Sequence, residues 1–381
     1  MYFYKILISL SKSPYFIPDK RGNPYKTENK ILTKYHSKEV NAHMIAKKRV
    51  IPLKIRQLEA LLRRLPQNHL KIPLIEQELI KRRTGYRGEK NVDYHISFLP
   101  DEYLIFHGLR LVHQHPFQID TLILAPSFIA AAEIKNISGT LYFEKHSHQL
   151  IRQSSKGEDG FSNPLLQVQR HKVQLKGWME KMKLPELPIE PLVIISSNST
   201  IVKTSTGNER IYKTVIHAEQ LPGKLEKLRP FSPSLILTSK EMNKVKRLLL
   251  KNHEPLYTSI LEQYSISPDE IIRGVQCPEC QLYAMSRFHG RWICPACAGE
   301  SKKAHIRAIL DYFLLVDNSV SSQKCRDFLL YDSSRNIHQL LSSLNLQSSG
   351  TTKNRLYHSP SEENWEDLEN LLNTPALQDK P

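Results

Sequence analysis

The sequence predicts a mixed α/β domain with a central sheet, followed by a small metal-held ribbon and a helical unit. Three observations predict this fold class. Patterns typical of helices and strands follow in the order α-β-β-β-α-β up to about residue 200, which favours helices packed on a sheet. Four of the five cysteines form two close pairs farther along the chain. Apolar residues then recur at helical spacing after residue 302.

Three helices are predicted in the α/β part of the chain, and prolines mark their ends. Apolar residues recur at helical spacing in the first two. Pro66 closes the first helix, whereas Pro164 suits the first turn of the third, where a missing N–H leaves no hydrogen bond unmade. The helices are expected over residues 51–65, from Pro73 towards Phe98, and from Pro164 to about Lys181.

Strands are predicted where β-branched, aromatic and other apolar residues gather between short turns. The polar stretch 154–163 contains two glycines and is expected to be a loop. The short apolar run 191–196 is typical of a buried strand. The expected strands are residues 103–112, 118–125, 128–135, 140–144, 149–152 and 191–196.

The remaining patterns divide the chain into further parts. Residues 241–250 predict a helix and residues 212–217 a strand, and the last twenty residues predict a loose acidic helix or tail. The expected organisation is an N-terminal extension (1–43), an α/β domain (44–200), an extension or connector (201–275), a zinc ribbon (276–300), a helical module (301–358) and an acidic tail (359–381).

Composition narrows the class of protein. The 381 residues include 54 Lys and Arg against 38 Asp and Glu, a net charge of +16. This balance favours a polyanion such as DNA as the partner, although a basic enzyme without a nucleic-acid role has the same composition. No apolar run approaches the ~20 residues that span a bilayer, so no membrane segment is expected.

The beginning of the chain is not expected to be a signal peptide. Residues 1–10 contain a short apolar run broken by Lys5 and lack a small-residue cleavage site. Few, closely paired cysteines favour metal binding in a reducing cytoplasm over disulfides in a secreted protein. Residues 1–43 show no amphipathic period, so either Met44 is the natural start or they form a disordered basic arm.

Two acids and a lysine lie near the ends of adjacent predicted strands. Asp120 is on one strand, and Glu133 and Lys135 are two residues apart on the next, so the latter two share a face. Two carboxylates suit Mg²⁺, which prefers oxygen ligands and keeps several waters. The alternative is a simple ion pair between Glu133 and Lys135 on a solvated face.

The flanking motifs support a site at this position. Gly85-Tyr-Arg-Gly-Glu89 lies in the preceding helix, where each glycine costs about 1 kcal/mol. Such a cost indicates close packing or backbone approach to a ligand, with Glu89 placed towards the site. Asn163-Pro-Leu-Leu-Gln167 opens the helix after the sheet and places Gln167 one turn inside it.

The order Gly-x-x-Gly-Glu, Ile-Asp, Glu-x-Lys-Asn and Asn-Pro-x-x-Gln resembles the nuclease-related domain (NERD), a branch of the PD-(D/E)xK nuclease-like superfamily. The resemblance covers about residues 73–200. It implies a restriction-endonuclease-like core, with Asp120 and Glu133 as ligands of Mg²⁺ (or Mn²⁺) and Lys135 as the catalytic lysine. Glu89 matches the family's first-helix acid, and Gln167 matches its glutamine.

The two cysteine pairs predict a structural zinc site. Thirteen residues, 281–293, separate Cys277-Pro-Glu-Cys280 from Cys294-Pro-Ala-Cys297. Four thiolates in two tight turns suit tetrahedral Zn²⁺ and leave no open position for catalysis. A redox dithiol pair is the weaker alternative. Three aromatic residues between the pairs, Tyr283, Phe288 and Trp292, are expected to support the ribbon. Whether the ribbon also contacts DNA stays open, and the residues that could do so are Arg287, His289 and Arg291.

Residues 302–358 resemble a helix-turn-helix module. Three short helices are expected, with a hairpin at the end that contains Gly350, Lys353 and Arg355. In such modules the third helix enters the major groove, so Arg335, His338 and Gln339 would face DNA together with Ser334. The alternative is an ordinary helical cap with solvated polar residues. Cys325 is expected to be a small buried hydrophobic residue rather than a fifth ligand.

Together these features predict a metal-dependent nuclease or nuclease-like protein that hydrolyses DNA phosphodiester bonds, a Mg²⁺-dependent deoxyribonuclease. The α/β core would do the chemistry, while the ribbon and the helical module position the substrate. The alternative is a non-catalytic nucleic-acid-binding protein that uses an inactive nuclease scaffold.

Overall fold

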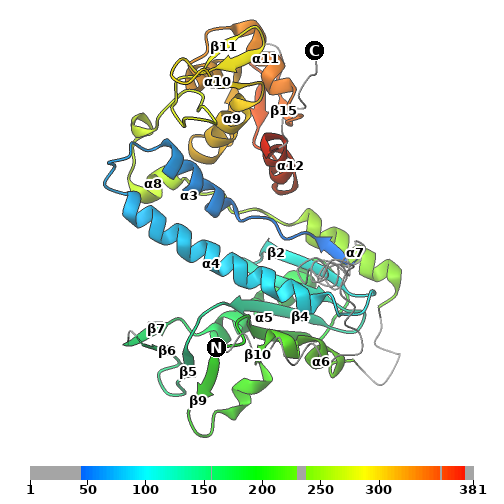
Figure 1. Ribbon diagram of the computed structural model, residues 1–381. Helices are drawn as coiled ribbons and strands as arrows, with labels where there is room; N and C mark the ends of the chain where they lie inside the picture. The colour runs from blue at the N-terminus through cyan, green and yellow to red at the C-terminus, as the bar shows by residue number, and fades with distance from the viewer. Residues whose placement is uncertain (1–43, 156, 230–236, 352–353, 374–381) are drawn as a thin grey trace, which may run out of the picture.

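The structure, a computed structural model, describes residues 44–155, 157–229, 237–351 and 354–373 (Figure 1). It has two lobes, the lower built around the central sheet and the upper formed by the C-terminal part of the chain. The expectations for residues 1–43 lie outside the described residues. Among the described helices, none is both long and apolar enough to cross a membrane.

The central sheet is mixed, as predicted. Its strand order is β1-β2-β3-β4-β8-β10. The pairs β2–β3 and β3–β4 are antiparallel, whereas β1–β2, β4–β8 and β8–β10 are parallel. The strands are β1 (Ile45–Lys47), β2 (Leu104–Val112), β3 (Pro116–Leu124), β4 (Ile129–Lys135), β8 (Ile189–Ile195) and β10 (Val215–His217).

Helices cover both faces of this sheet. On one face, Val92 of α4 and Leu221 of α6 pack in one apolar cluster with Ile123 of β3. On the other, Trp178 of α5 and Val245 of α7 pack with other residues of β2, β3 and β4. The helices are α4 (Ile72–Ile96), α5 (Pro164–Lys181), α6 (Leu221–Glu226) and α7 (Ser239–Lys251). The resulting three-layer core confirms the predicted α/β class.

A second sheet has the order β7-β6-β5-β9 and packs beside α5. The prediction that residues 154–163 form a loop is wrong, because β7 pairs antiparallel with β6, Leu150 lying opposite Phe161. This edge strand is polar and largely exposed, so its pairing leaves no apolar pattern in the sequence. The strands are β5 (Thr140–Phe143), β6 (Leu150–Ser154), β7 (Gly157–Phe161) and β9 (Ile201–Thr204).

The strand predicted over residues 212–217 is shorter in the structure. A 3₁₀ turn, η1 (Glu209–Lys213), precedes β10, so only Val215–His217 are extended. Ile211 in this turn is buried, whereas Tyr212, the first residue of the predicted strand, is exposed. Two further short 3₁₀ turns are η2 (Ala218–Gln220) and η4 (Pro268–Glu270).

The upper lobe has one apolar core, which also receives helix α3 (Leu53–Arg64). The apolar residues that recur at helical spacing after residue 302 are buried, among them Phe313, Phe328 and Ile337. The elements are α8 (Ile260–Tyr264), β11 (Ser286–Phe288), β12 (Arg291–Ile293), β13 (Glu300–Ser301), α9 (Ala304–Leu315), β14 (Ser319–Ser321), α10 (Ser322–Leu329), α11 (Ser334–Ser342), β15 (Ser348–Ser349), β16 (Leu356–His358) and α12 (Glu362–Asn373).

Charged contacts join α3 and the acidic helix α12 to this lobe. Arg64 is fully buried and donates to Asp311 of α9 at 2.9 Å. Arg56 of α3 pairs with Glu369 of α12, which also buries Trp365. The acidic segment is therefore a packed helix rather than a loose one, because its apolar residues recur at helical spacing.

Candidate active site and zinc centre

The strands β3 and β4 diverge where the predicted acids lie. Their ladder runs from Leu124 opposite Ile129 to Thr121 opposite Ala132. Beyond it the two strands separate, while β3 stays paired with β2 and β4 with β8. In the resulting gap the Asp120 carboxyl accepts a hydrogen bond from the Ile134 N–H at 2.8 Å. A side chain thus replaces a backbone partner and is fixed in place between the two strands.

A glycine on β2 lies opposite Asp120. Gly108 stands between the pairs His107–Thr121 and Leu109–Ile119, and it adopts a φ of 58° that favours glycine. The strand's alternation reverses here, since Leu109 packs on the same face as Phe106. The kink brings Gly108 and Asp120 to the wall of one pocket.

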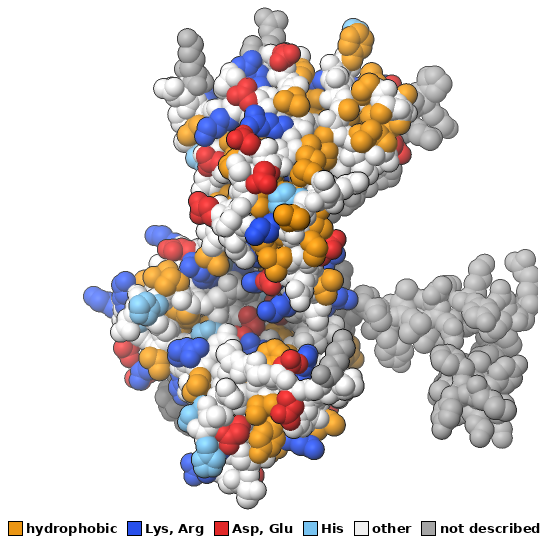
Figure 2. Space-filling view, turned by 90° about the vertical axis from the view of Figure 1, so that its left-hand side faces the viewer, with side chains coloured by type: hydrophobic (Ala, Val, Ile, Leu, Met, Phe, Trp, Pro, Cys, Tyr) orange, Lys and Arg blue, Asp and Glu red, His pale blue; other side chains and the backbone are white. Residues whose placement is uncertain are grey.

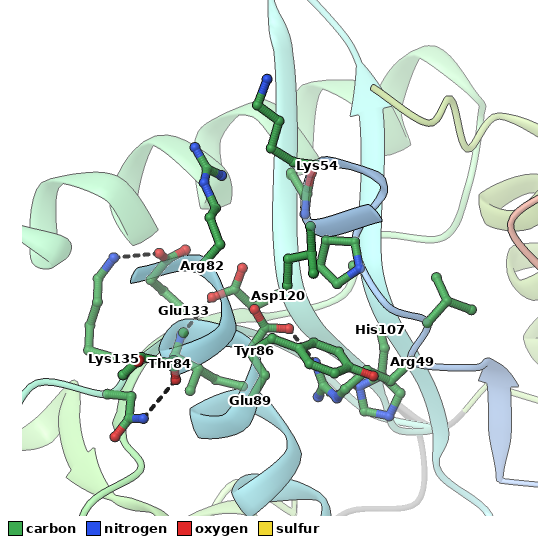
Figure 3. Close-up of a pocket in the computed structure, with 18 of the residues that line it drawn as sticks. Arg49, Lys54, Arg82, Thr84, Tyr86, Glu89, His107, Asp120, Glu133 and Lys135 are labelled. Atoms are coloured by element: carbon green, nitrogen blue, oxygen red, sulfur yellow. Dashed lines mark hydrogen bonds and ion pairs between the residues drawn. The ribbon is translucent and has the colours of Figure 1, made fainter. Parts of the chain in front are cut away.

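The pocket has a volume of about 780 Å³ and gathers residues from α4, β2, β3 and β4. The carboxyl groups of Glu89, Asp120 and Glu133 form a row within it (Figure 3). Lys135 pairs with Glu133 at one end, 2.7 Å away, and Arg49 pairs with Glu89 at the other, 2.6 Å away. Three acids from three separate elements therefore share one site with two flanking cations.

Burial changes the acidity of this row. It raises the pKa of Asp120 to about 7, with the neighbouring Glu133 carboxylate adding to the effect. Burial and Asp120 together raise the pKa of Glu89 to about 7, although Arg49 opposes them. Burial likewise raises the pKa of Glu133 against the pull of Lys135. Neighbouring buried carboxylates repel one another, which a cation between them would relieve.

The residues fit a hard divalent cation. Glu133 is only 5% exposed, and its Oε2 atom is buried without a hydrogen-bond partner among the described residues. Carboxylate oxygens are the ligands that Mg²⁺ and Mn²⁺ prefer. An orphaned carboxylate oxygen beside a second carboxyl group is therefore well suited to hold such an ion, with Asp120 and Glu133 as its ligands.

Gln167 reaches this site through Lys135. The Asn163 side chain accepts from the Leu165 N–H at 2.9 Å and caps α5, so Gln167 lies one turn inside the helix. Its Oε1 atom accepts a hydrogen bond from Lys135 Nζ at 3.3 Å. The structure thus brings all five predicted residues together, four in the pocket wall and Gln167 behind Lys135.

Close packing accounts for one of the two glycines in α4. A Cβ atom on Gly88 would lie 2.3 Å from the Cβ of Asn136 and 2.8 Å from Ser196 Oγ. Asn136 in turn donates to the Thr84 carbonyl at 2.8 Å. The absence of a side chain at Gly88 therefore lets α4 approach the end of β4, which holds Glu89 over the site.

Sequence reasoning missed Arg49. Its side chain is 7% exposed and donates to Asp93 and Glu89 as well as contacting the His107 ring, with Nη2 2.7 Å from Nδ1. Burial and Arg49 lower the pKa of His107 to about 2, so this ring is neutral. Arg49 follows β1, and nothing in the local sequence pattern links it to an acid forty residues later.

Replacing Arg49 should destabilise the protein. Arg49→Met leaves Glu89 and Asp93 without their partner, and loss of one member of a largely buried ion pair costs about 3 kcal/mol. Arg87 is exposed on α4, the helix that carries Glu89 and Asp93, and is the matched control. Arg87→Met should change the free energy of unfolding by less than about 0.5 kcal/mol. Urea denaturation measures both, and equal unfolding free energies would contradict the role of Arg49.

The four paired cysteines form one cluster. All four Sγ atoms lie within 4.8 Å of one another, with Cys277 3.6 Å from Cys297 and Cys280 3.5 Å from Cys294. Their geometry fits a structural Zn²⁺ ion, as predicted. Cys325 lies in the apolar core of the upper lobe, as expected for a small hydrophobic residue.

The aromatic support of the ribbon differs in part from the prediction. Trp292 is buried and donates through Nε1 to His305 Nδ1 at 3.1 Å, and Tyr283 donates to the Arg63 carbonyl at 2.9 Å. The expectation for Phe288 is wrong, because its ring is 64% exposed at the hairpin tip. Phe288 opposes Arg291, whereas Trp292 on the other face meets α9.

The predicted DNA-facing residues of the helical module are partly described. His338 and Gln339 are exposed on α11, and His338 contacts Ser322 Oγ on α10 at 3.3 Å. Arg355 is exposed just before β16, which forms a small sheet with β14 and β15. The side chain of Arg335 and all of Lys353 lie outside the described residues.

Comparison with protein families identifies a nuclease-related domain over residues 84–196. All five predicted site residues lie within this stretch, whereas Arg49 and the zinc cluster lie outside it. No curated protein and no solved structure matches the chain. The nuclease-like fold that this family implies agrees with the mixed α/β core, and the recognition from sequence motifs is confirmed.

Proposed function

We propose that the nuclease-related domain is a metal-dependent deoxyribonuclease that hydrolyses DNA phosphodiester bonds. The observation that carries this proposal is the meeting of three carboxyl groups from α4, β3 and β4 in one pocket, with Lys135 beside them. Phosphodiester hydrolysis requires charge stabilisation on the phosphate and an activated water, and acids with a lysine provide the protein side of both.

The roles follow from the contacts. Asp120 and Glu133 would hold Mg²⁺ or Mn²⁺, which when bound stabilises negative charge on the phosphate and acidifies a water. Lys135 Nζ, held between Glu133 and Gln167, is positioned to orient the attacking water or to neutralise charge in the transition state. Glu89 is held by Arg49 with its carboxyl group in the pocket, where it can accept a hydrogen bond from water.

The surroundings of the pocket suit a polyanion. Figure 2 shows Lys and Arg side chains beside Asp and Glu side chains at the waist between the two lobes. Several cations line the pocket around its acidic floor, and phosphate contacts by Lys and Arg supply most of the affinity for DNA. They are Lys54, Lys81, Arg82, Arg110 and Arg152, whereas Lys47, Arg49 and Lys135 also line the pocket but are held in ion pairs with acids of the protein.

The C-terminal lobe would position the substrate. Exposed His338 and Gln339 on α11, and Arg355 near the small sheet, offer a surface for DNA of the helix-turn-helix type. We assign Arg335 and Lys353 to the same surface from the sequence. The zinc cluster would be structural, and thiolate ligands of this kind suit a reducing cytoplasm.

Purified wild-type protein should cleave plasmid or single-stranded DNA in Mg²⁺ or Mn²⁺, and EDTA should abolish this cleavage. The reason is that the buried acids need a cation before a phosphate can approach them. Gel electrophoresis of the products measures the rate. DNA binding without cleavage in either metal would contradict the proposal and support a non-catalytic nucleic-acid-binding protein instead.

A further inference from the structure

Gly85 has no packing role in α4. A Cβ atom added there would meet no atom within 4 Å, whereas one added at Gly88 would collide with Asn136. Gly85 is exposed and lines the pocket that contains the carboxyl row. Glycine in the interior of a helix is unfavourable. The fold therefore gives no reason for Gly85, but a ligand that contacts the helix backbone would.

Three basic side chains line the pocket close to Gly85. Lys81 and Arg82 precede Gly85 by four and three residues, so they lie on the same side of α4. Lys54 on α3 lines the same pocket, and burial together with the nearby Arg82 lowers its pKa. Figure 3 shows Lys54 and Arg82 on the same side of the three carboxyl groups. Glu78 pairs with Arg82 at 2.6 Å and offsets part of this charge. Lys54 and Lys81 keep an excess of positive charge beside the pair, which a phosphate would offset.

We propose that Gly85 is the floor of a backbone subsite for one strand of a nucleic acid. One phosphodiester would lie against α4 at Gly85, and Lys54, Lys81 and Arg82 would pair with the adjoining phosphates. This subsite leads from the carboxyl row towards α3, so it sets the direction in which the strand leaves the site. The inference rests on the proposed nuclease function, because it uses the same pocket.

Substitution of Gly85 separates binding from folding. Gly85→Ala should raise the Tm by about 2 °C, because alanine favours the helix and meets open space. The same substitution should weaken DNA binding. Gly85→Leu places a larger side chain in the subsite and should raise the Kd about tenfold or more. Stability and affinity therefore change in opposite directions, which damage to the fold would not produce.

Gly223 provides the matched control. It lies exposed in α6, meets nothing within 4 Å of an added Cβ, and does not line the pocket. Gly223→Ala and Gly223→Leu should leave the Kd unchanged. Fluorescence anisotropy with a labelled single strand of about 20 nucleotides measures binding, with all variants in an Asp120→Asn background, which slows cleavage during the measurement. An unchanged Kd for Gly85→Leu would overturn the subsite.

Salt dependence tests the cations. Arg82→Gln should reduce the slope of log K against log salt concentration by about 0.7 on single-stranded DNA, the value for one lost phosphate contact. Arg87→Gln, on the same helix but outside the pocket, should keep the wild-type slope. Equal slopes for the two variants would contradict the phosphate contact at Arg82. A wild type that binds through this subsite but does not cleave would refute the proposed catalysis alone.

Discussion

Asp120→Asn should lower the rate of DNA cleavage by roughly 10³-fold, which corresponds to about 4 kcal/mol of transition-state stabilisation. Asparagine keeps a side-chain oxygen that can accept the hydrogen bond from the Ile134 N–H, so the gap between β3 and β4 should keep its shape. It removes the negative charge that Asp120 would offer to a cation beside Glu133. Single-turnover cleavage in Mg²⁺ measures the effect.

The same substitution should not destabilise the metal-free protein. Asp120, Glu89 and Glu133 repel one another, and the removal of one charge relieves this repulsion. Asp269→Asn is the control, because Asp269 is highly exposed and pairs only at the surface with Arg273. It should retain the wild-type rate within a factor of about two. An Asp120→Asn protein that cleaves at more than a tenth of the wild-type rate would refute the assignment.

The pocket's acids could be predicted because the chemistry follows from local spacing. Glu133 and Lys135 share a face of one strand by the two-residue period, and Asp120 lies on the neighbouring strand. The bounds of α5 also agree with the prediction, since Asn163 and Pro164 form an N-terminal signal that needs no distant partner.

Arg49 could not be predicted because its role depends on a distant pairing. β1 lies parallel to β2, with Ile45 opposite Ile105, and this register places Arg49 beside Glu89 and His107. A three-residue strand carries almost no periodic signal of its own. Helix α12 differs, because its acidic composition led to the prediction of a loose helix or tail, although Trp365 and Leu368, spaced three apart, pack in the core of the upper lobe.

The zinc centre should be essential to the upper lobe. Cys294→Ser should abolish zinc binding and unfold the ribbon, since structural zinc supplies about 10–16 kcal/mol to small metal-held units. Cys277 and Cys294 are fully buried in the core that contains Trp292 and α9. Loss of the ribbon therefore exposes Trp292 and removes its hydrogen bond to His305. Hydrogen exchange should show lost protection over residues 275–301 and weaker protection in α9.

Other readouts separate this loss from general unfolding. Protection in β3 and β4 should persist, because the core of the central sheet contains no residue of the ribbon. Affinity for DNA should fall, because the ribbon packs against the first helix of the module that we assign to DNA binding. Cys325→Ser is the matched control: this buried cysteine lies outside the cluster and should leave one zinc equivalent bound. Wild-type protein with much less than one equivalent of zinc and a protected ribbon would contradict the metal's structural role.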